Sequence, residues 1–334
     1  MSILKWHELH GDAFAGQRAL VTGGAGFIGS HLARALLALD AEVVVLDDFS
    51  GSDRTAVDAM SKDFGERLSV VQATVLDRDA MFEAAAGCAW VFHEAALVSV
   101  PESVRQPARY HGIDATGTLV ALEAARHAGA RRLMFAASAA AYGDDPALPK
   151  HEDMPPRPQS PYAAAKLAGE MLLRSHAACY DLDTVSLRYF NVFGPGQNVN
   201  SAYAAVIAAF ADRLGHGLAP AIHGDGEQSR DFVFIDNVVH ANLLAACCEQ
   251  PLGGAALNVA CGRRVSIAQL ATTMGEMFGR PDLPPTFGEP RAGDVKHSVA
   301  DITAIREALG YEPMIGFEDG LRATVAWYAR AAAA

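Results

Sequence analysis

Residues 18–31, RALVTGGAGFIGSH, decide the fold of this chain. The apolar run at their start predicts a buried strand, and the segment after the glycines has the apolar spacing of a helix. Between them, Gly24, Gly26 and Gly29 fit G-x-G-x-x-G; with Gly23 in the first place the related G-x-x-G-x-x-G also fits. Such glycines let the backbone approach a pyrophosphate at a helix N-terminus, although they also suit an ordinary tight turn. The surroundings of the motif therefore decide its meaning.

The end of the next apolar run supports a dinucleotide site. EVVVLD ends at Asp47, where a carboxylate accepts hydrogen bonds from the adenosine ribose hydroxyls of a bound dinucleotide and repels a 2′-phosphate. This position favours NAD over NADP. Asp48, the following residue, is the alternative for the same role.

Short apolar runs alternate with helical stretches across the first half of the chain. The runs lack the period-2 alternation of half-exposed strands, as buried strands of parallel sheets do; they are RALVTG, EVVVLD, LSVVQA, WVFHEAA and RRLMFAAS. Segments with helical spacing, such as FIGSHLARALLAL, separate them. The alternation predicts right-handed βαβ units and therefore an α/β protein with a Rossmann-type doubly wound parallel sheet.

The composition changes near residue 191, where glycine, proline and asparagine become frequent, as in NVFGPGQNVN. We expect an NAD-binding Rossmann domain over residues 1–190, to which later segments near 230–260 return. Residues 191–334 should mainly form a smaller C-terminal α/β substrate domain, laid over the carboxyl edge of the sheet, where ligands bind in open α/β folds.

Charge and cysteine content exclude several classes of partner. A formal net charge of −12 argues against nucleic-acid and anionic-membrane partners. No run of about 18 apolar residues predicts a membrane span, and the N-terminus lacks the apolar stretch of a signal peptide. The cysteines form no C-x-x-C pair and have no histidine cluster beside them, so we expect reduced thiols, no metal site and a cytoplasmic protein; they are Cys88, Cys179, Cys247, Cys248 and Cys261.

Residues 160–166, SPYAAAK, have the pattern of a helix start, with Ser160 suited to the N-cap and a proline after it. Tyr162 and Lys166 are then four residues apart on one helical face. A phenol ionises at about pH 10 in water; a nearby ammonium and the positive charge of NAD⁺ would lower its pKa and make Tyr162 a candidate base. Ser138, which ends RRLMFAAS, supplies a hydroxyl to share the substrate proton. Each of these residues also suits a structural role by itself.

Together the motifs resemble the extended short-chain dehydrogenase/reductase superfamily, and within it the UDP-hexose 4-epimerases, particularly those acting on UDP-N-acetylglucosamine. The resemblance covers nearly the whole chain and implies an isomerase that keeps NAD tightly bound, with residues 191–334 mainly binding the nucleotide sugar. The motifs that carry it, in order, are TGGAGFIGSH, VVVLDD, HEAALVSVPES, SAAAYG, PYAAAK, LRYFNVFGPGQ, DGEQSRDF and EPRAGDVKHSVAD.

The resemblance implies that Tyr162 takes the proton from the sugar 4-hydroxyl while hydride leaves C4 for the nicotinamide. The 4-keto sugar then turns over in the pocket and receives hydride on its opposite face, so the net reaction is inversion at C4. Lys166 would also hold the nicotinamide ribose, and Ser138 would position the reacting oxygen. The implied cofactor-binding residues are Gly23, Gly26, Phe27, Ile28, Gly29, Asp47, Asp48, Thr74, Val75, Ala95, Ala96, Lys166 and Tyr189.

The resemblance also implies a nucleotide-sugar site. Arg230 and Arg291 match two diphosphate-binding arginines, whose planar forks suit a pyrophosphate. Asp294 matches the carboxylate that holds the uridine ribose, and Asn191 matches a substrate-contacting amide. Ser298 stands where a large aromatic residue closes the pocket to a 2-acetamido group. Its small side chain predicts room for UDP-GlcNAc and UDP-GalNAc without rejecting UDP-glucose and UDP-galactose.

Some positions depart from the family pattern. Thr74 replaces an aspartate that contacts adenine, with the backbone of the next residue still able to do so. Asp114 replaces the asparagine of N-x-x-G-T; an ionised aspartate only accepts hydrogen bonds, whereas the amide also donates. Ala139 and Ala140 stand where acetamido-sugar epimerases often carry serines, which weakens the predicted preference for acetamido sugars.

Other functions remain alternatives to different degrees. A 4,6-dehydratase would need proton-transferring side chains at Ala139 and Ala140, and alanine transfers none, so this reaction is excluded. A UDP-glucuronate 4-epimerase or decarboxylase, or another NAD-dependent nucleotide-sugar enzyme, stays open, although no group for the extra carboxylate is identified. A non-catalytic NAD-binding sensor is a remote alternative, against which the intact Tyr162, Lys166 and Ser138 speak.

A homodimer is the implied assembly. Helices around residues 115–129 and 162–178 would pair with their counterparts in a four-helix interface, because their alanine-rich faces permit close approach. A helix buried within one subunit has the same composition, so the pattern favours a dimer without excluding a monomer.

Overall fold

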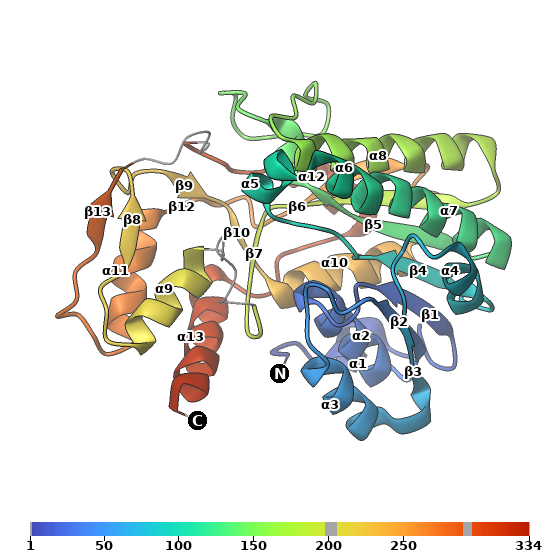
Figure 1. Ribbon diagram of the computed structural model, residues 1–334, viewed down its shortest axis with the longest axis horizontal. Helices are drawn as coiled ribbons and strands as arrows, with labels where there is room; N and C mark the ends of the chain where they lie inside the picture. Colours follow the sequence, from blue (N-terminus) through green and yellow to red (C-terminus); the bar gives the residue numbers. More distant parts are fainter. Residues whose placement is uncertain (1, 198–205, 290–295, 334) are drawn as a thin grey trace.

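Seven parallel strands form the central sheet of this protein, which we describe from a computed structural model (Figure 1). The structure describes residues 2–197, 206–289 and 296–333, with side chains up to residue 330. The strands lie in the order β3 (Leu68–Gln72), β2 (Glu42–Asp47), β1 (Arg18–Thr22), β4 (Trp90–His93), β5 (Arg132–Ser138), β6 (Asp183–Tyr189) and β11 (Ala255–Val259). The apolar runs predicted as strands are β1 to β5, all in parallel pairs, so the predicted Rossmann-type sheet is confirmed.

Helices cover both faces of the sheet, which explains the continuous apolar runs. One face packs against α2 (Phe27–Ala38) and α10 (Ile235–Cys247), and the other against α4 (Arg78–Ala85), α7 (Gly117–Ala128) and α8 (Pro161–Cys179). In β2, Val43 and Val45 enter the first core, while Val44 and Leu46 enter the second. Because every side chain of the strand's middle is buried, polar alternation would cost free energy on one face.

Shorter helices link these layers. They are α1 (Trp6–His10), α3 (Thr55–Phe64), the 3₁₀ turn η1 (Gly65–Arg67), α5 (Val100–Arg105), α6 (Pro107–Tyr110), the π-helical turn η2 (His111–Thr116) and the 3₁₀ turn η3 (Ala139–Tyr142). The π turn runs directly into α7 and packs against α8. Of the helices in the described ranges, none combines the length and apolar character needed to cross a bilayer.

The C-terminal part forms a smaller lobe, at the left of Figure 1, built on three two-stranded pairings. Parallel pairs join β7 (Asn191–Phe193) to β10 (Phe232–Phe234) and β8 (Ala221–His223) to β13 (Thr286–Gly288), and an antiparallel pair joins β9 (Ser229–Arg230) to β12 (Val265–Ser266). Its helices are α9 (Val206–Gly215), α11 (Ile267–Met277) and α13 (Phe317–Ala333), whereas α12 (Thr303–Leu309) packs against β11 and α10. Between these elements, α10 and β11 return to the large sheet; the domain division at residue 190 stays a prediction.

The order of the strands places the ligand crevice. The chain proceeds from β1 outward to β2 and β3, and then from β4 in the opposite direction to β5 and β6. The switch point therefore lies between β1 and β4, and open α/β sheets bind ligands beyond the carboxyl ends of the strands at this point. The glycine-rich turn follows β1 there, and residues 94–99 follow β4.

Candidate active site

The glycine-rich turn is shaped for close approach. Gly23 has a φ of +65°, and a Cβ on it would lie 2.7 Å from the backbone nitrogen of Ala95, in the loop after β4. A Cβ on Gly29 would overlap the carbonyl oxygen of Gly23. Gly26 stands at the N-cap of α2 and provides no side-chain cap, and the partly buried Phe27 and Ile28 begin the helix. The turn thus presents a helix N-terminus at the switch point, which suits a pyrophosphate.

Of the two adjacent acids, Asp47 lies against this turn. Its Oδ2 accepts from the backbone N–H of Ala25 at 3.0 Å, and its Oδ1 accepts from the N–H of Phe49 at 2.8 Å. Asp48 is exposed and accepts from the N–H of Ser50 at 2.9 Å. The geometry therefore favours Asp47 over Asp48 as the carboxylate for a dinucleotide ribose.

The other residues proposed to contact the cofactor line the neighbouring strand ends. Thr74 Oγ1 accepts from the N–H of Leu76 at 3.4 Å, so this hydroxyl is used within its own turn. Val75 is buried, and a Cβ on Gly117 would lie 2.6 Å from its Cγ2. Ala95 and Ala96 are partly buried after β4, and the N–H of Ala95 donates to Thr22 Oγ1 at 3.3 Å.

Ser138, Tyr162 and Lys166 meet at the carboxyl end of β5. Ser160 caps α8 as predicted, since its Oγ accepts from the N–H of Ala163 at 3.1 Å. This start places Tyr162 in the first turn of the helix, which packs on β5, and Ser138 at the last position of that strand acts to lower the pKa of the phenol. Lys166, one turn further, is 2% exposed and donates from Nζ to the Ala136 carbonyl at 2.8 Å.

The acidity of Tyr162 differs from the expectation drawn from its spacing to Lys166. Burial raises the pKa of the Tyr162 phenol to about 12, and the hydrogen bond from Ser138 opposes this rise. Burial also lowers the pKa of Lys166, against the pull of nearby carboxylates. The predicted lowering by the ammonium is therefore wrong for the protein alone: Lys166 is not among the groups that act on the phenol, and desolvation raises its pKa. A positively charged nicotinamide would act in the required direction.

Two acids beside Lys166 were not predicted as part of the site by sequence reasoning. Glu94 follows β4, and its Oε1 accepts from the Tyr189 hydroxyl at 2.8 Å, while Asn242 Nδ2 donates to that hydroxyl at 2.8 Å. Burial raises the pKa of Glu94 to about 7, opposed by the Tyr189 hydrogen bond and by Lys166. Asp114, in η2, is the second acid and is also buried. The signal for Glu94 was its place directly after a buried strand, where parallel sheets gather functional groups.

His93, at the end of β4, is structural. It is fully buried, and its ring nitrogens contact Thr22 Oγ1 at 2.8 Å and Thr118 Oγ1 at 3.1 Å. Burial, reinforced by Lys166, lowers the pKa of His93 to about 3, so the ring is neutral at physiological pH. It holds the β1 and β4 ends against α7 and carries no charge into the site.

The residues proposed for the nucleotide sugar converge around β9. Arg230 Nη1 donates to the carbonyl of Ser229 at 2.9 Å, and the N–H of Ser298 donates to the same carbonyl at 3.0 Å. Asn191 is exposed, and its N–H donates to the Asp231 carbonyl at 3.1 Å. The structure thus brings Asn191, Arg230 and Ser298 together. Arg291 and Asp294, the other two residues of this set, lie outside the described residues.

Asp231 anchors this region, and the sequence reasoning missed it. The carboxylate is fully buried and accepts from the N–H groups of Cys261 at 2.9 Å and Ala300 at 3.1 Å. Burial raises its pKa to about 6, against these backbone hydrogen bonds. It therefore joins β10, the end of β11 and the segment after residue 296.

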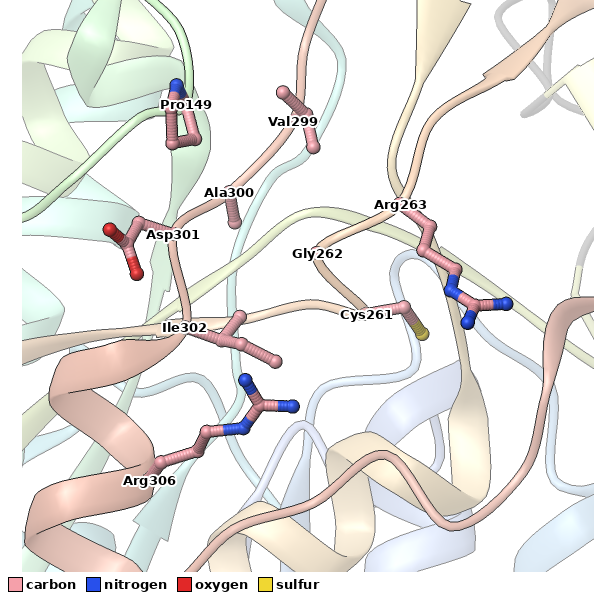
Figure 2. A pocket seen from close by; sticks show the side chains of 9 residues that line it. All are labelled: Pro149, Cys261, Gly262, Arg263, Val299, Ala300, Asp301, Ile302 and Arg306. Atoms are coloured by element: carbon pink, nitrogen blue, oxygen red, sulfur yellow. The ribbon is translucent and has the colours of Figure 1, made fainter.

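A cavity of about 540 Å³ lies beside the two loops that Asp231 joins. Figure 2 shows the Cys261 thiol on the side of Arg263, while the carboxylate of Asp301 points away. Arg306, which also lines the cavity, pairs with Glu312 at 2.7 Å. The catalytic candidates Ser138, Tyr162 and Lys166 are not among the lining residues, so this cavity is separate from the candidate active site.

Known proteins resemble this chain over most of its length. The model of the NAD dependent epimerase/dehydratase family matches residues 19–260. A UDP-glucose 4-epimerase from Mycolicibacterium smegmatis is 39% identical over 318 residues, which cover 93% of this chain and 98% of that protein.

Two solved structures are similar in fold and sequence. The UDP-N-acetylglucosamine 4-epimerase from Methanobrevibacter ruminantium M1, in complex with UDP-N-acetylmuramic acid, superposes with a TM-score of 0.89 at 36% identity, covering 95% of this chain and 99% of that one. The UDP-glucose 4-epimerase from Thermotoga maritima, with UDP-glucose, has a TM-score of 0.86 at 36% identity, covering 94% and 99%. The predicted family, enzyme class and NAD dependence are confirmed by these matches.

Proposed function

Because the chain belongs to the NAD-dependent epimerase/dehydratase family, we propose that it reversibly inverts C4 of a UDP-hexose through a 4-keto intermediate. One observation carries the proposal: Tyr162, Ser138 and Lys166 meet at the carboxyl end of β5, at the same edge of the sheet as the glycine-rich turn after β1 and separated from it by β4. A base for an alcohol proton and a site for a dinucleotide thereby lie at one edge of the sheet. Each is needed to oxidise a secondary alcohol and reduce the ketone again.

The residues at this edge fit NAD. The N-cap Gly26 leaves the α2 N-terminus for a pyrophosphate, and the Asp47 carboxylate at the turn would hold the adenosine ribose. When bound, NAD supplies a hydride acceptor that becomes the donor for the return step. Lys166 would donate to the nicotinamide ribose.

The chain's own residues would manage the proton. Tyr162, as phenolate, would accept the proton of the sugar 4-hydroxyl through its Oη and return it when the ketone is reduced. Ser138 would donate a hydrogen bond to the same sugar oxygen. In the protein alone, Ser138 acts to lower the pKa of the Tyr162 phenol and so favours the phenolate. Since burial disfavours the phenolate, full activity depends on the cation of the oxidised cofactor beside it.

We further propose that the sugar carries a 2-acetamido group, so that UDP-GlcNAc and UDP-GalNAc interconvert, with UDP-glucose and UDP-galactose as additional substrates. The support is Ser298, a small and partly buried residue held by its N–H beside Arg230. Arg230 would hold the diphosphate, and Asn191 the sugar. A diphosphate held at this distance from C4 would retain a ketone that rotates within the pocket.

The test is NMR of the purified holoenzyme with UDP-GlcNAc, UDP-GalNAc, UDP-glucose, UDP-galactose and UDP-glucuronate, each without added NAD. We expect interconversion of the acetamido pair, and slower interconversion of the plain pair. Turnover of UDP-glucuronate alone would replace this proposal by the glucuronate 4-epimerase. With no conversion of any UDP-sugar by folded, NAD-containing enzyme, the proposal is wrong.

We propose that two copies pair through α7 and α8. Leu119 on α7 and Met171 on α8 are 38% and 49% exposed although both are apolar, and Val104 on the adjoining α5 is 63% exposed. Light scattering should give a mass near twice the 35.3 kDa of one chain, and Met171→Glu should lower it. A monomeric mass for the unaltered protein at micromolar concentration would contradict this assembly.

A further inference from the structure

Asn258 is a fully buried amide whose hydrogen bonds reach three separate segments. It lies in β11, an edge strand of the seven-stranded sheet. Its Oδ1 accepts from the Tyr142 hydroxyl at 2.7 Å, and its Nδ2 donates to the carbonyls of Lys150 at 3.0 Å and Asp301 at 3.1 Å. Both N–H groups of the amide and its oxygen are thereby used. An ionised aspartate or an alkyl side chain cannot form this set, because it cannot both donate and accept.

The first segment is the turn that follows β5. Ser138 caps this turn, η3, since its Oγ accepts from the N–H of Ala140 at 3.1 Å, and Tyr142 is the last residue of the turn. The Tyr142 ring is buried, and the guanidinium carbon of Arg188 lies 4.8 Å from its centre. Arg188 is also the β6 partner of Asn258. The hydroxyl of Tyr142 therefore reaches Asn258 from a turn that is fixed to the end of β5.

The other two segments are joined to each other through their backbones. The N–H of Lys150 donates to the Val299 carbonyl at 2.8 Å, and the N–H of Asp301 donates to the Lys150 carbonyl at 2.8 Å. Lys150 therefore forms a parallel bridge with Ala300. Lys150 belongs to the connection from β5 to α8, whereas the opposite side of the bridge directly follows Ser298.

The segment that carries Ser298 is thus held from two sides. On one side, the N–H of Ser298 donates to the carbonyl of Ser229 in β9 at 3.0 Å. On the other side, three residues further along, the Asp301 carbonyl accepts from Asn258. One side chain therefore joins the turn after Ser138 to the segment after Ser298. A buried polar network in which every group is paired favours a single arrangement of the segments that it joins.

We propose that Asn258 is a positioning residue for sugar selection: its amide fixes the segment that carries Ser298 relative to the turn that Ser138 caps. The inference rests on the proposed function, in which Ser138 acts at the reacting oxygen and Ser298 borders the acetamido group. A side chain at position 298 excludes a substituent only if its backbone cannot retreat. Without the amide, the carbonyls of Lys150 and Asp301 lose two donors, and the segment is free to move away from the sugar.

The experiment is a double-mutant cycle on binding. Dissociation constants for UDP-GlcNAc and UDP-glucose are measured by calorimetry on NAD-loaded protein that also carries Tyr162→Phe, so that bound sugars are not converted. In this starting protein, Ser298→Tyr should weaken binding of UDP-GlcNAc relative to UDP-glucose by about 10- to 100-fold. With Asn258→Ala added, the same substitution should change the ratio at least about threefold less, because residues that act through one network are not additive.

Asn237→Ala is the matched control. Asn237 is also a fully buried asparagine, and its amide forms two hydrogen bonds with the backbone of Ile315, at 2.8 Å and 2.9 Å. These bonds join α10 to the segment before α13. Loss of this amide should destabilise the fold as well, yet leave the effect of Ser298→Tyr on the binding ratio within about twofold of its original size.

An undiminished effect of Ser298→Tyr in folded, NAD-containing Asn258→Ala would overturn the inference, as would an equal reduction in Asn237→Ala. A Ser298→Tyr substitution without effect on the ratio would also overturn it, because position 298 would then select nothing. Should Asn258→Ala fail to fold, Asn258→Asp gives the same test: it keeps an acceptor for the Tyr142 hydroxyl and, when ionised, removes both donors to the other two segments.

Failure of the proposed function has a different signature. If the starting protein bound neither UDP-sugar, the proposed function would be contradicted, and the inference that depends on it would fall with it. If the sugars bound and the cycle were additive, the positioning role of Asn258 alone would be wrong. The measurement needs no turnover, so the two failures are distinguishable.

Discussion

The two ends of the candidate site are built differently. At the cofactor end, Gly23, Ser138 and Lys166 stand on or beside strands of one seven-stranded sheet, with a helix packed on each face. At the sugar end, Arg230 and Ser298 are held by backbone hydrogen bonds on two-residue strands and connecting segments. The first end is held by a large core and the second by local pairings. Under the proposed function, the chemistry common to all substrates would be supported by the core, and selectivity would be supported by loops, which tolerate change at less cost.

The sharpest test of the cofactor end is Tyr162→Phe. Loss of the proposed base should reduce turnover of every accepted UDP-sugar at least about 10³-fold, because the phenylalanine ring has no hydroxyl to take the proton of the sugar 4-hydroxyl. Bound NAD should remain, measured by its release on denaturation. If Tyr162→Phe lost activity toward only one sugar, Tyr162 would act in substrate selection, and the proposed difference between the cofactor end and the sugar end would be wrong.

A second test changes the glycine-rich turn after β1. Gly23→Ala should weaken NAD retention at least about ten-fold and lower the free energy of unfolding by about 1–2 kcal/mol, since the residue has a positive φ and its Cβ meets Ala95. Chemical denaturation and NAD content after gel filtration measure both. Gly51→Ala is a matched control, because a Cβ there meets no atom within 4 Å and its φ is not positive. Equal losses of bound NAD and of unfolding free energy in both variants would show that position 23 does not require glycine.

The sugar end is tested by Ser298→Tyr. A large ring beside Arg230 should lower kcat/KM for UDP-GlcNAc relative to UDP-glucose by about 10- to 100-fold, while NAD content stays unchanged. Ser298→Ala keeps the space and should leave the ratio near its original value. An equal loss for both sugars in the tyrosine variant would show that Ser298 does not select the substrate.

The smallest expected effect concerns Glu94. Burial raises the pKa of Glu94 to about 7. Between about pH 4.5 and pH 7 the folded protein therefore keeps a proton that the unfolded chain has released, and the contribution of Glu94 to the free energy of unfolding falls as the pH rises through this range. Glu94→Gln should remove this dependence. The free energy of unfolding of the variant, relative to that of the unaltered protein, should be about 1 kcal/mol higher at pH 8 than at pH 5. Urea denaturation at both values measures it. A pH-independent difference would mean that Glu94 is ionised throughout.

Reasoning from the sequence predicted most residues of the candidate cofactor end, because their signals are local. The Ser160 cap, the spacing of Tyr162 and Lys166, and the glycine-rich turn each depend on a few consecutive residues. Arg291 and Asp294 are predicted from the motif alone. The acids around Lys166 were not predicted as site residues. Glu94, for example, accepts a hydrogen bond from Tyr189, which lies 95 positions further along the chain, and Asn242, from a third segment, donates to the same hydroxyl. No periodicity in one segment reports such a contact.

The sequence by itself determined the parallel sheet and predicted the dinucleotide turn and the candidate base, since each follows from backbone sterics, helix capping and hydrophobic burial within short segments. Only the tertiary structure decided how strongly that base resists ionisation. Desolvation is the largest cause that raises the pKa of Tyr162, although a lysine stands one turn away on the same helix. Desolvation is a property of everything packed around a group, so it arises only when distant segments meet.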